Sequence, residues 1–153
     1  MEQEKVSAGL ASVNELLKTP GEPMVAASVR TAAQGDFDQA WSAVFGDGKI
    51  KSVLFTAAGR REGVSTLVAG AGLTGARIDA RRRVAIIDLN LRYPQQGRLV
   101  EARETPGLAD VLAGKATLEQ VAQTVGAGNL TLYVAGERLQ SALPLLAGSA
   151  VGD

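Results

Sequence analysis

One short segment constrains the fold of this chain more than any other. Residues 84–89 read VAIIDL, an apolar run broken only by an aspartate near its end. Such runs are typical of strands that are buried on both faces of a parallel sheet. Residues 50–57 (IKSVLFTA) and 130–135 (LTLYVA) have strand character as well. Glycine turns and helical segments separate the three, which predicts a three-layer α/β fold whose central strands are all parallel.

The residues before the first predicted strand favour helices. Apolar residues recur at helical spacing over residues 6–18, and the sequence TPGEP at 19–23 is expected to end that helix and act as a linker. A second helical stretch is predicted over residues 24–34. The chain is therefore divided into an N-terminal helical segment with linker, residues 1–48, and an α/β domain, residues 49–153.

Two pairs of residues resemble capping boxes, in which the first and fourth residues bond each other's backbone at a helix start. Asp36 with Gln39 is expected to open a helix that ends at Gly46. Thr117 with Gln120 is expected to open a later helix whose apolar face extends to residue 125.

Composition removes several classes of chemistry. The sequence contains no cysteine and no histidine, which excludes disulfides, thiolate metal sites, a cysteine nucleophile and a serine–histidine triad. No apolar run reaches the roughly 18 residues that cross a bilayer, and the N-terminus does not resemble a secretory signal. A cytoplasmic location is the expectation.

Charge is unevenly distributed although the net charge is zero. Residues 51–103 hold ten basic groups against four acidic ones, a net +6, so the remainder carries −6. A basic stretch of this kind can meet phosphate, nucleic acid or an acidic partner, or it can be a set of solvated helix ends and loops.

A glycine-containing turn follows the first predicted strand. A turn at this place is where P-loop proteins bind phosphate, usually with the spacing G-x-x-x-x-G-K-[ST]. Here Ala58 stands at the first glycine position and Val64 at the lysine position. The residues placed to contact a phosphate are Gly59, Arg60, Arg61, Gly63, Ser65 and Thr66.

Four blocks of sequence, in order, resemble the bacterial tyrosine autokinases of the capsular exopolysaccharide family. Residues 86–94 (IIDLNLRYP) are similar to its second acidic motif, and residues 105–118 to its PGLSDVL-x-G-x-x-x-L segment. Residues 129–136 and 143–146 are similar to its next strand and to the tail that follows. The chain thus looks like a degenerate member of the deviant P-loop group that includes the MinD and ParA ATPases.

The departures from the family pattern concern its chemistry. Val64 replaces the phosphate-binding lysine and Asn90 the second aspartate, whereas Asp88 and Arg92 remain. The resemblance implies that Asp88 is a candidate magnesium ligand and that Arg92 belongs to the nucleotide site. The fold is expected to be truncated before the family's Walker B strand, and the C-terminal tyrosine cluster is missing. We therefore expect no catalytic residue and no firmly held cofactor: ATP and magnesium should bind weakly or not at all.

Each candidate residue also has a structural interpretation. Gly59 and Gly63 can simply form a tight turn. Arg60 and Arg61 can be solvated, or they can reach a phosphate in place of the lysine. Asp88 can cap the turn after its strand instead of holding a metal.

The resemblance leads to a non-catalytic or weakly active kinase-like subunit, a pseudokinase, in exopolysaccharide or capsule synthesis or export. Its expected partner is a true kinase domain or the cytoplasmic tail of a membrane polysaccharide co-polymerase, which would recruit it to the membrane. Homo-oligomers are a further expectation, because a short parallel sheet leaves apolar surface to cover. One alternative is an ATP-dependent tyrosine autokinase or ATPase that uses an arginine in place of the lysine. The other is a ParA- or MinD-like positioning module, although no nucleic-acid partner is expected under the leading reading.

Overall fold

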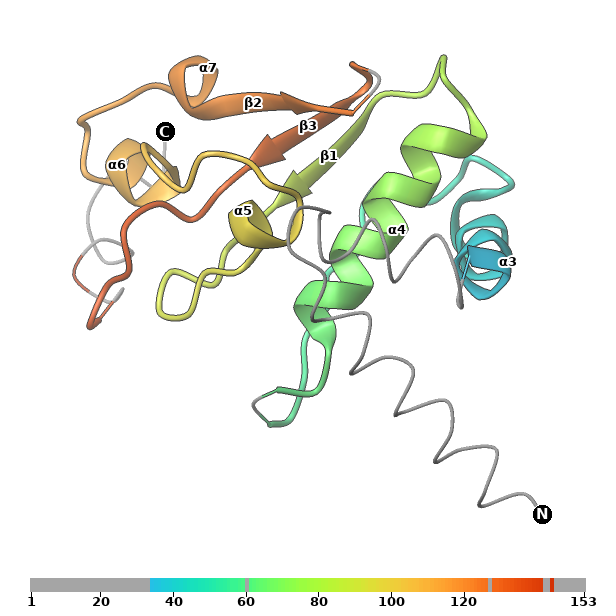
Figure 1. The fold of residues 1–153 in the computed structure, drawn as a ribbon, viewed down its shortest axis with the longest axis horizontal. Helices are drawn as coiled ribbons and strands as arrows, with labels where there is room; N and C mark the ends of the chain where they lie inside the picture. Colours follow the sequence, from blue (N-terminus) through green and yellow to red (C-terminus); the bar gives the residue numbers. More distant parts are fainter. Residues whose placement is uncertain (1–33, 60, 127, 142–143, 145–153) are drawn as a thin grey trace.

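A three-stranded sheet with one long helix packed on it forms the centre of the molecule (Figure 1). The computed structural model describes residues 34–59, 61–126, 128–141 and 144. The described residues do not include the predicted helix at 6–18, the linker after it, or the helix predicted at 24–34 apart from Gln34. Arg60 and nearly all of the 143–146 block lie outside them as well. The elements, in chain order, are α3 (Gln34–Phe45), α4 (Val64–Ile78), β1 (Val84–Ile87), α5 (Gln96–Leu99), α6 (Leu108–Leu112), α7 (Leu118–Val121), β2 (Ala122–Val125) and β3 (Leu130–Tyr133).

The strands lie in the spatial order β1–β3–β2. β1 and β3 are parallel, with Val84 opposite Leu130 and Ile87 opposite Tyr133. This parallel pair and the helix on it confirm the predicted α/β class. β2 is antiparallel to β3, so the sheet is mixed, and the prediction that all its strands are parallel is wrong.

The main core lies between α4 and one face of the sheet. Ile86, Leu130, Leu132 and Val134 are buried there, and Val68, Leu73 and Ala76 of α4 pack against them. The opposite face of β1 is open: Ile87 is 55% exposed, as is Leu89 just beyond the strand at 66%. The prediction that β1 is buried on both faces is therefore wrong.

Glycines in α4 allow close packing on both sides of this helix. A β-carbon at Gly72 would lie within 2.7 Å of the Ile86 side chain, on the sheet side. On the other side, β-carbons at Gly70 and Gly75 would meet the aromatic rings of Phe37 and Trp41 from α3. Glycine inside a helix costs about 1 kcal/mol relative to alanine. Here the missing side chains let α3 and the sheet approach α4, and α4 is unbroken over its 15 residues.

Two predicted elements were wrong in type or extent. Residues 50–57 form no strand, and no backbone hydrogen bond joins them to another described residue. The helix opened by Thr117 stops at Val121, because Ala122 already has extended backbone angles (φ −64°, ψ 131°). Strand β2 follows at once, and the side-chain amide of Gln123 both accepts from the Arg103 N–H and donates to its carbonyl, each at 2.8 Å.

The local signals at helix ends were more dependable. The Thr117–Gln120 capping box is confirmed, with Thr117 N–H donating to Gln120 Oε1 at 2.8 Å. Helix α3 ends before Gly46 as predicted. Gln34 and Gly35 are already helical, however, so Asp36 lies inside the helix and does not cap it. None of the helices among the described residues has the length and apolar character to span a bilayer.

Candidate functional site

The glycine turn leads directly into α4. Gly63 is the residue that precedes the helix and has left-handed angles (φ 81°, ψ 6°), which glycine adopts without strain. The first helical hydrogen bond runs from Leu67 N–H to the Gly63 carbonyl, at 2.9 Å. The backbone N–H groups before Leu67 have no acceptor within the helix. They are therefore placed to donate to an anion at this helix start.

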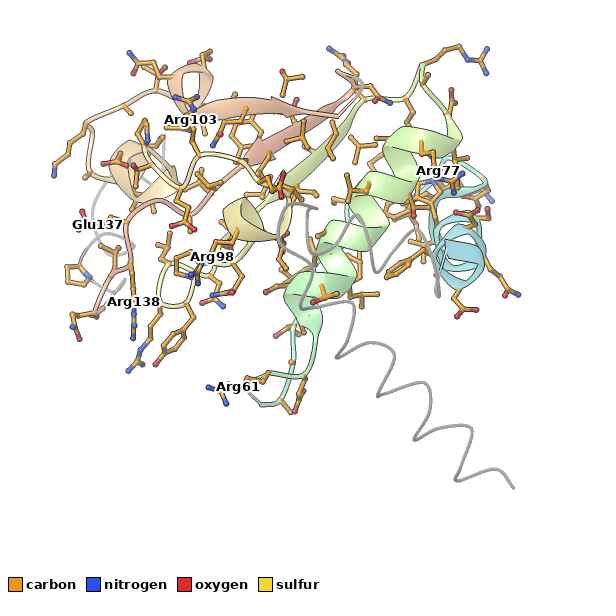
Figure 2. All side chains as sticks on the ribbon, viewed as in Figure 1. Arg61, Arg77, Arg98, Arg103, Glu137 and Arg138 are labelled. Carbon is orange, nitrogen blue, oxygen red and sulfur yellow. The ribbon has the colours of Figure 1, made fainter. Side chains whose placement is uncertain are left out.

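Among the described residues of the turn and the first helical turn, Arg61 is the one basic side chain. Val64 is half-buried at the position where a P-loop has its lysine, followed by half-buried Ser65 and exposed Thr66. Arg61 is exposed at the tip of the turn (Figure 2), with a left-handed φ of 63°. The Glu62 carboxylate lies against Gly59, with Oε1 2.6 Å from where a β-carbon of that glycine would be. A carboxylate in the turn opposes anion binding, because like charges repel.

Asp88 follows β1 and organises the loop after it. Its buried carboxylate accepts three backbone hydrogen bonds, all at 3.1 Å: Oδ1 from Asn90 N–H, and Oδ2 from the N–H groups of Gln95 and Gln96. These bonds tie the end of β1 to the start of α5. This is the capping arrangement that the sequence offers as the structural role of Asp88.

Gln96 joins the acidic motif to the glycine turn, a link that sequence reasoning missed. Its side chain is 4% exposed, and Nε2 donates to the carbonyl of Ser65 at 3.0 Å. Asp88 and the first turn of α4 are thereby connected through one residue. The Oε1 atom of Gln96 is buried without a hydrogen-bond partner among the described residues. No local pattern marks such a bond, because it joins residues 31 positions apart.

Arg92 lies in a second cluster, with Tyr93 and Arg138. The guanidinium carbons of Arg92 and Arg138 lie 5.5 Å and 4.8 Å from the centre of the Tyr93 ring, within the range of a cation–π interaction. A backbone bond of 2.9 Å from Leu139 N–H to the Leu91 carbonyl joins the two loops that carry these residues. Arg138 was also missed in the sequence, since it comes from the loop after β3.

Three of the four arginines at the end of α4 and in the turn before β1 make contacts within the fold, namely Arg77, Arg81 and Arg82, whereas Arg83 is exposed. Arg77 pairs with Asp38 of α3, and Arg82 donates to the carbonyl of Phe45 at 3.1 Å. The Arg81 backbone N–H, and to a lesser extent its side chain, holds the pKa of Asp79 below its usual value. These contacts favour the structural interpretation of the +6 stretch at this turn.

The residues present fit an anion better than they fit magnesium–ATP. Free amides and Arg61 can meet a phosphate oxygen, but the lysine that a P-loop extends toward the terminal phosphates has no counterpart. Both oxygens of Asp88 are already bonded to backbone groups. Among the described residues, no three carboxylate, histidine or cysteine side chains gather in a group that could hold a metal ion.

Comparison with solved structures identifies the kind of fold. The chimerical protein CapA2B2 matches 92% of this chain with a TM-score of 0.67 and 18% identity. The kinase domain of the Escherichia coli tyrosine kinase ETK matches 60% of the chain at 26% identity, with a TM-score of 0.54. The BceF tyrosine kinase domain matches 98% at 21% identity, with a TM-score of 0.61. The fold is similar to that of bacterial tyrosine-kinase domains.

The similarity concerns part of each solved structure. This chain spans 58% of the CapA2B2 chain, 35% of the ETK domain and 59% of the BceF domain. No protein-family model matches the sequence, and no curated protein matches it. The comparisons therefore establish the fold, and the activity of the whole kinases is a separate question for this chain.

Proposed function

We propose that this protein is a non-catalytic or weakly active tyrosine-kinase-like subunit that acts in the assembly or export of an exopolysaccharide or capsule. The fold similarity to the ETK and BceF kinase domains supports the kinase-like assignment. The sequence motifs shared with exopolysaccharide autokinases support the pathway. In this proposal the protein works in the cytoplasm, at the inner face of the membrane, by binding protein partners.

The observation that carries the proposal is Val64 at the start of α4. A lysine there supplies the point charge that stabilises a transferring phosphoryl group in P-loop enzymes. Valine supplies none, and its side chain is half-buried in the fold. The Glu62 carboxylate in the turn repels a phosphate, and the Asp88 carboxylate already accepts backbone hydrogen bonds, so neither side chain favours the binding of ATP and magnesium. We infer that ATP and magnesium bind weakly or not at all, and that the degenerate turn serves the fold.

Calorimetry with ATP and magnesium tests this inference, together with an autophosphorylation assay using labelled ATP. We expect no saturable heat with protein at tens of micromolar, and no transfer of phosphate to the chain. A magnesium-dependent dissociation constant in the low micromolar range would refute the proposal. Inorganic phosphate alone serves as a comparison, since weak binding at the helix start is compatible with the proposal.

One alternative has a specific observation in its favour. Arg61 is exposed at the tip of the turn and could take the place of the lysine. An autokinase or ATPase of this kind predicts measurable hydrolysis that disappears in Arg61→Ala. Arg98→Ala is the matched control, because this exposed arginine pairs with Glu104 on a different part of the surface. Hydrolysis that is lost only in Arg61→Ala would favour the enzyme over the pseudokinase.

The proposed partner is a true kinase domain or the cytoplasmic tail of a membrane polysaccharide co-polymerase. The exposed apolar side chains on and after β1 support binding to a protein, because uncovered apolar surface commonly marks such sites. Co-purification of the tagged chain with each candidate, expressed together, tests this choice. Recovery of neither partner would contradict it.

A further inference from the structure

The outer edge of β1 carries unpaired backbone groups. Val84 and Asp88 direct their N–H groups toward β3, each with a bond of 2.9 Å. Because hydrogen-bonding directions alternate along a strand, Ala85 and Ile87 direct their N–H and C=O groups to the opposite edge. β1 is the end strand of the sheet, so nothing in the described structure pairs with that edge. Edges of this kind are templates for another strand.

Apolar side chains beside this edge are exposed to an unusual degree. Ile87 and Leu89 are 55% and 66% exposed on the face that α4 does not cover. Proteins usually shield an edge strand with charges, proline or a bulge, and β1 (VAII) has none of these. The other edge differs: β2 (AQTV) has an exposed threonine, Thr124, and its glutamine is bonded to Arg103. The open apolar edge is therefore that of β1.

Residues 50–57 also have backbone groups without a hydrogen-bond partner among the described residues. This β-rich segment lacks backbone bonds to the other described residues, and its Val53 and Leu54 are 41% and 79% exposed. It runs behind α4 toward the glycine turn, in the same sense as β1 runs toward its own loop (Figure 1).

The charges around the edge indicate the chemistry of the added strand. Exposed Lys51 and Arg83 lie at the amino ends of the 50–57 segment and of β1. Exposed Arg61 and Arg92 lie beyond their carboxyl ends, where the acidic residues are exposed Glu62 and buried Asp88. An apolar strand with acidic residues on both sides would complement this pattern, whereas one with basic flanks would be repelled.

We propose that the free edge of β1 is a docking site for one extended strand of a protein partner, with an apolar centre and acidic flanks. The partner's backbone pairs with Ala85 and Ile87, and its side chains cover the exposed face of β1. This is strand addition, in which main-chain hydrogen bonds provide affinity and side chains provide specificity. The inference rests on the proposed function for its biological meaning, since it names the chemistry of that function's protein partner.

A labelled synthetic peptide tests the proposal without nucleotide, so that its outcome is independent of the ATP measurements. The peptide has six alternating valine and isoleucine residues between paired aspartates. We expect saturable binding in fluorescence anisotropy, with a dissociation constant below about 100 μM, a binding free energy of at least about 5.5 kcal/mol. We also expect slower amide hydrogen exchange at Ala85 and Ile87. The absence of binding would overturn the proposal even if the chain proves inactive toward ATP.

Two peptide controls and three protein variants sharpen the result. A peptide with N-methyl groups at alternate residues cannot form the ladder, and one with lysine flanks opposes the charges, so both should bind at least tenfold more weakly. Ile87→Pro removes an outward N–H and should therefore abolish binding. The variant should still fold, because proline is tolerated on an edge strand. Ile87→Lys serves the same purpose if the proline variant does not fold.

Thr124→Lys changes the other edge and should bind like the wild type. Equal binding of all three peptides would overturn the proposal. Binding that survives both Ile87 variants would do so as well, and so would a stable dimer of the chain that protects Ile87 and excludes the peptide.

Discussion

The contact between Trp41 of α3 and Gly75 of α4 allows a direct test of how these two helices pack. In Gly75→Ala, the new β-carbon would lie within 2.6 Å of three atoms of the Trp41 ring. The ring cannot move freely, because it also packs against the tilted ring of Phe45 with a centroid distance of 4.3 Å. The substitution should therefore displace α3 from α4.

The magnitude follows from two opposing effects. Alanine favours a helix over glycine by about 1 kcal/mol. Displacing the ring exposes about 100 Å² of apolar surface, half of what a tryptophan commonly buries, which costs about 2.5 kcal/mol. We expect Gly75→Ala to lower the free energy of unfolding by about 1.5 kcal/mol. Gly35→Ala is the matched control: it lies in α3, no atom of the described residues outside the helix's own backbone lies within 4 Å of a new β-carbon, and the change should not destabilise the protein.

Urea unfolding followed by circular dichroism measures both variants, and fluorescence reports on the same contact because Trp41 is the only tryptophan in the chain. A double-mutant cycle with Trp41→Ala isolates the interaction. Without the ring, Gly75→Ala should stabilise the protein by about 1 kcal/mol, the helix-propensity term alone. A neutral or stabilising effect of Gly75→Ala in the presence of Trp41 would refute the reasoning.

Three further predictions concern polar groups that hold the fold. Asp88→Ala should lower the free energy of unfolding by about 1–3 kcal/mol in urea titration, since three backbone donors lose their acceptor; an unchanged midpoint would contradict this. Asn129→Ala should cost a similar 1–3 kcal/mol, because its Nδ2 donates to the carbonyl of Ala76 at 2.8 Å and so secures the end of α4; exchange of the α4 amides should rise accordingly. The pKa of Asp79, followed by NMR, should lie below 3.8 and stay low in Arg81→Gln, since the main cause is the Arg81 backbone N–H. Because the pKa of Asp79 is lower in the folded state, the stability that this carboxylate contributes is present above the unfolded pKa and is lost as the pH falls through the folded pKa. A pKa of ordinary value in the wild type would refute this assignment.

The sequence predicted those features that depend on neighbours in the chain. The capping box at Thr117 forms because its two members lie within one turn of helix. The turn at Gly63 follows from a glycine, which adopts left-handed backbone angles without strain. The parallel pairing of β1 and β3 was expected from the alternation of strand and helix, a pattern that restricts topology strongly.

Pairing between segments that are distant in the sequence was harder to predict. Residues 50–57 have the composition of a strand, but a strand requires a partner, and none of the described residues provides one. Residues 122–125 continue the helical spacing of apolar residues, yet they pair with β3. Composition cannot distinguish these outcomes, because each depends on what lies next to the segment in space.

In the candidate site, too, local features could be predicted from the sequence and long-range contacts could not. The absence of a lysine at Val64 is visible in the sequence, and so is the option that Asp88 caps a turn. The contributions of Gln96 and Arg138 were not predicted, because each acts on a residue more than 30 positions away. Gln96 begins the four-residue helix α5 and Arg138 lies in a loop, so no periodic pattern marks the direction of either side chain.

The order of the strands has a consequence for how the chain is made. β3, the central strand of the sheet, is the last strand in the described sequence, while its partner β1 is complete more than 40 residues earlier. During synthesis, β1 therefore leaves the ribosome with neither edge paired and waits for Leu130–Tyr133 before any sheet exists. At about 5–20 residues per second this interval lasts a few seconds, during which the VAII segment is exposed to aggregation. We expect yields of this protein to depend on translation speed and on chaperones that hold apolar segments.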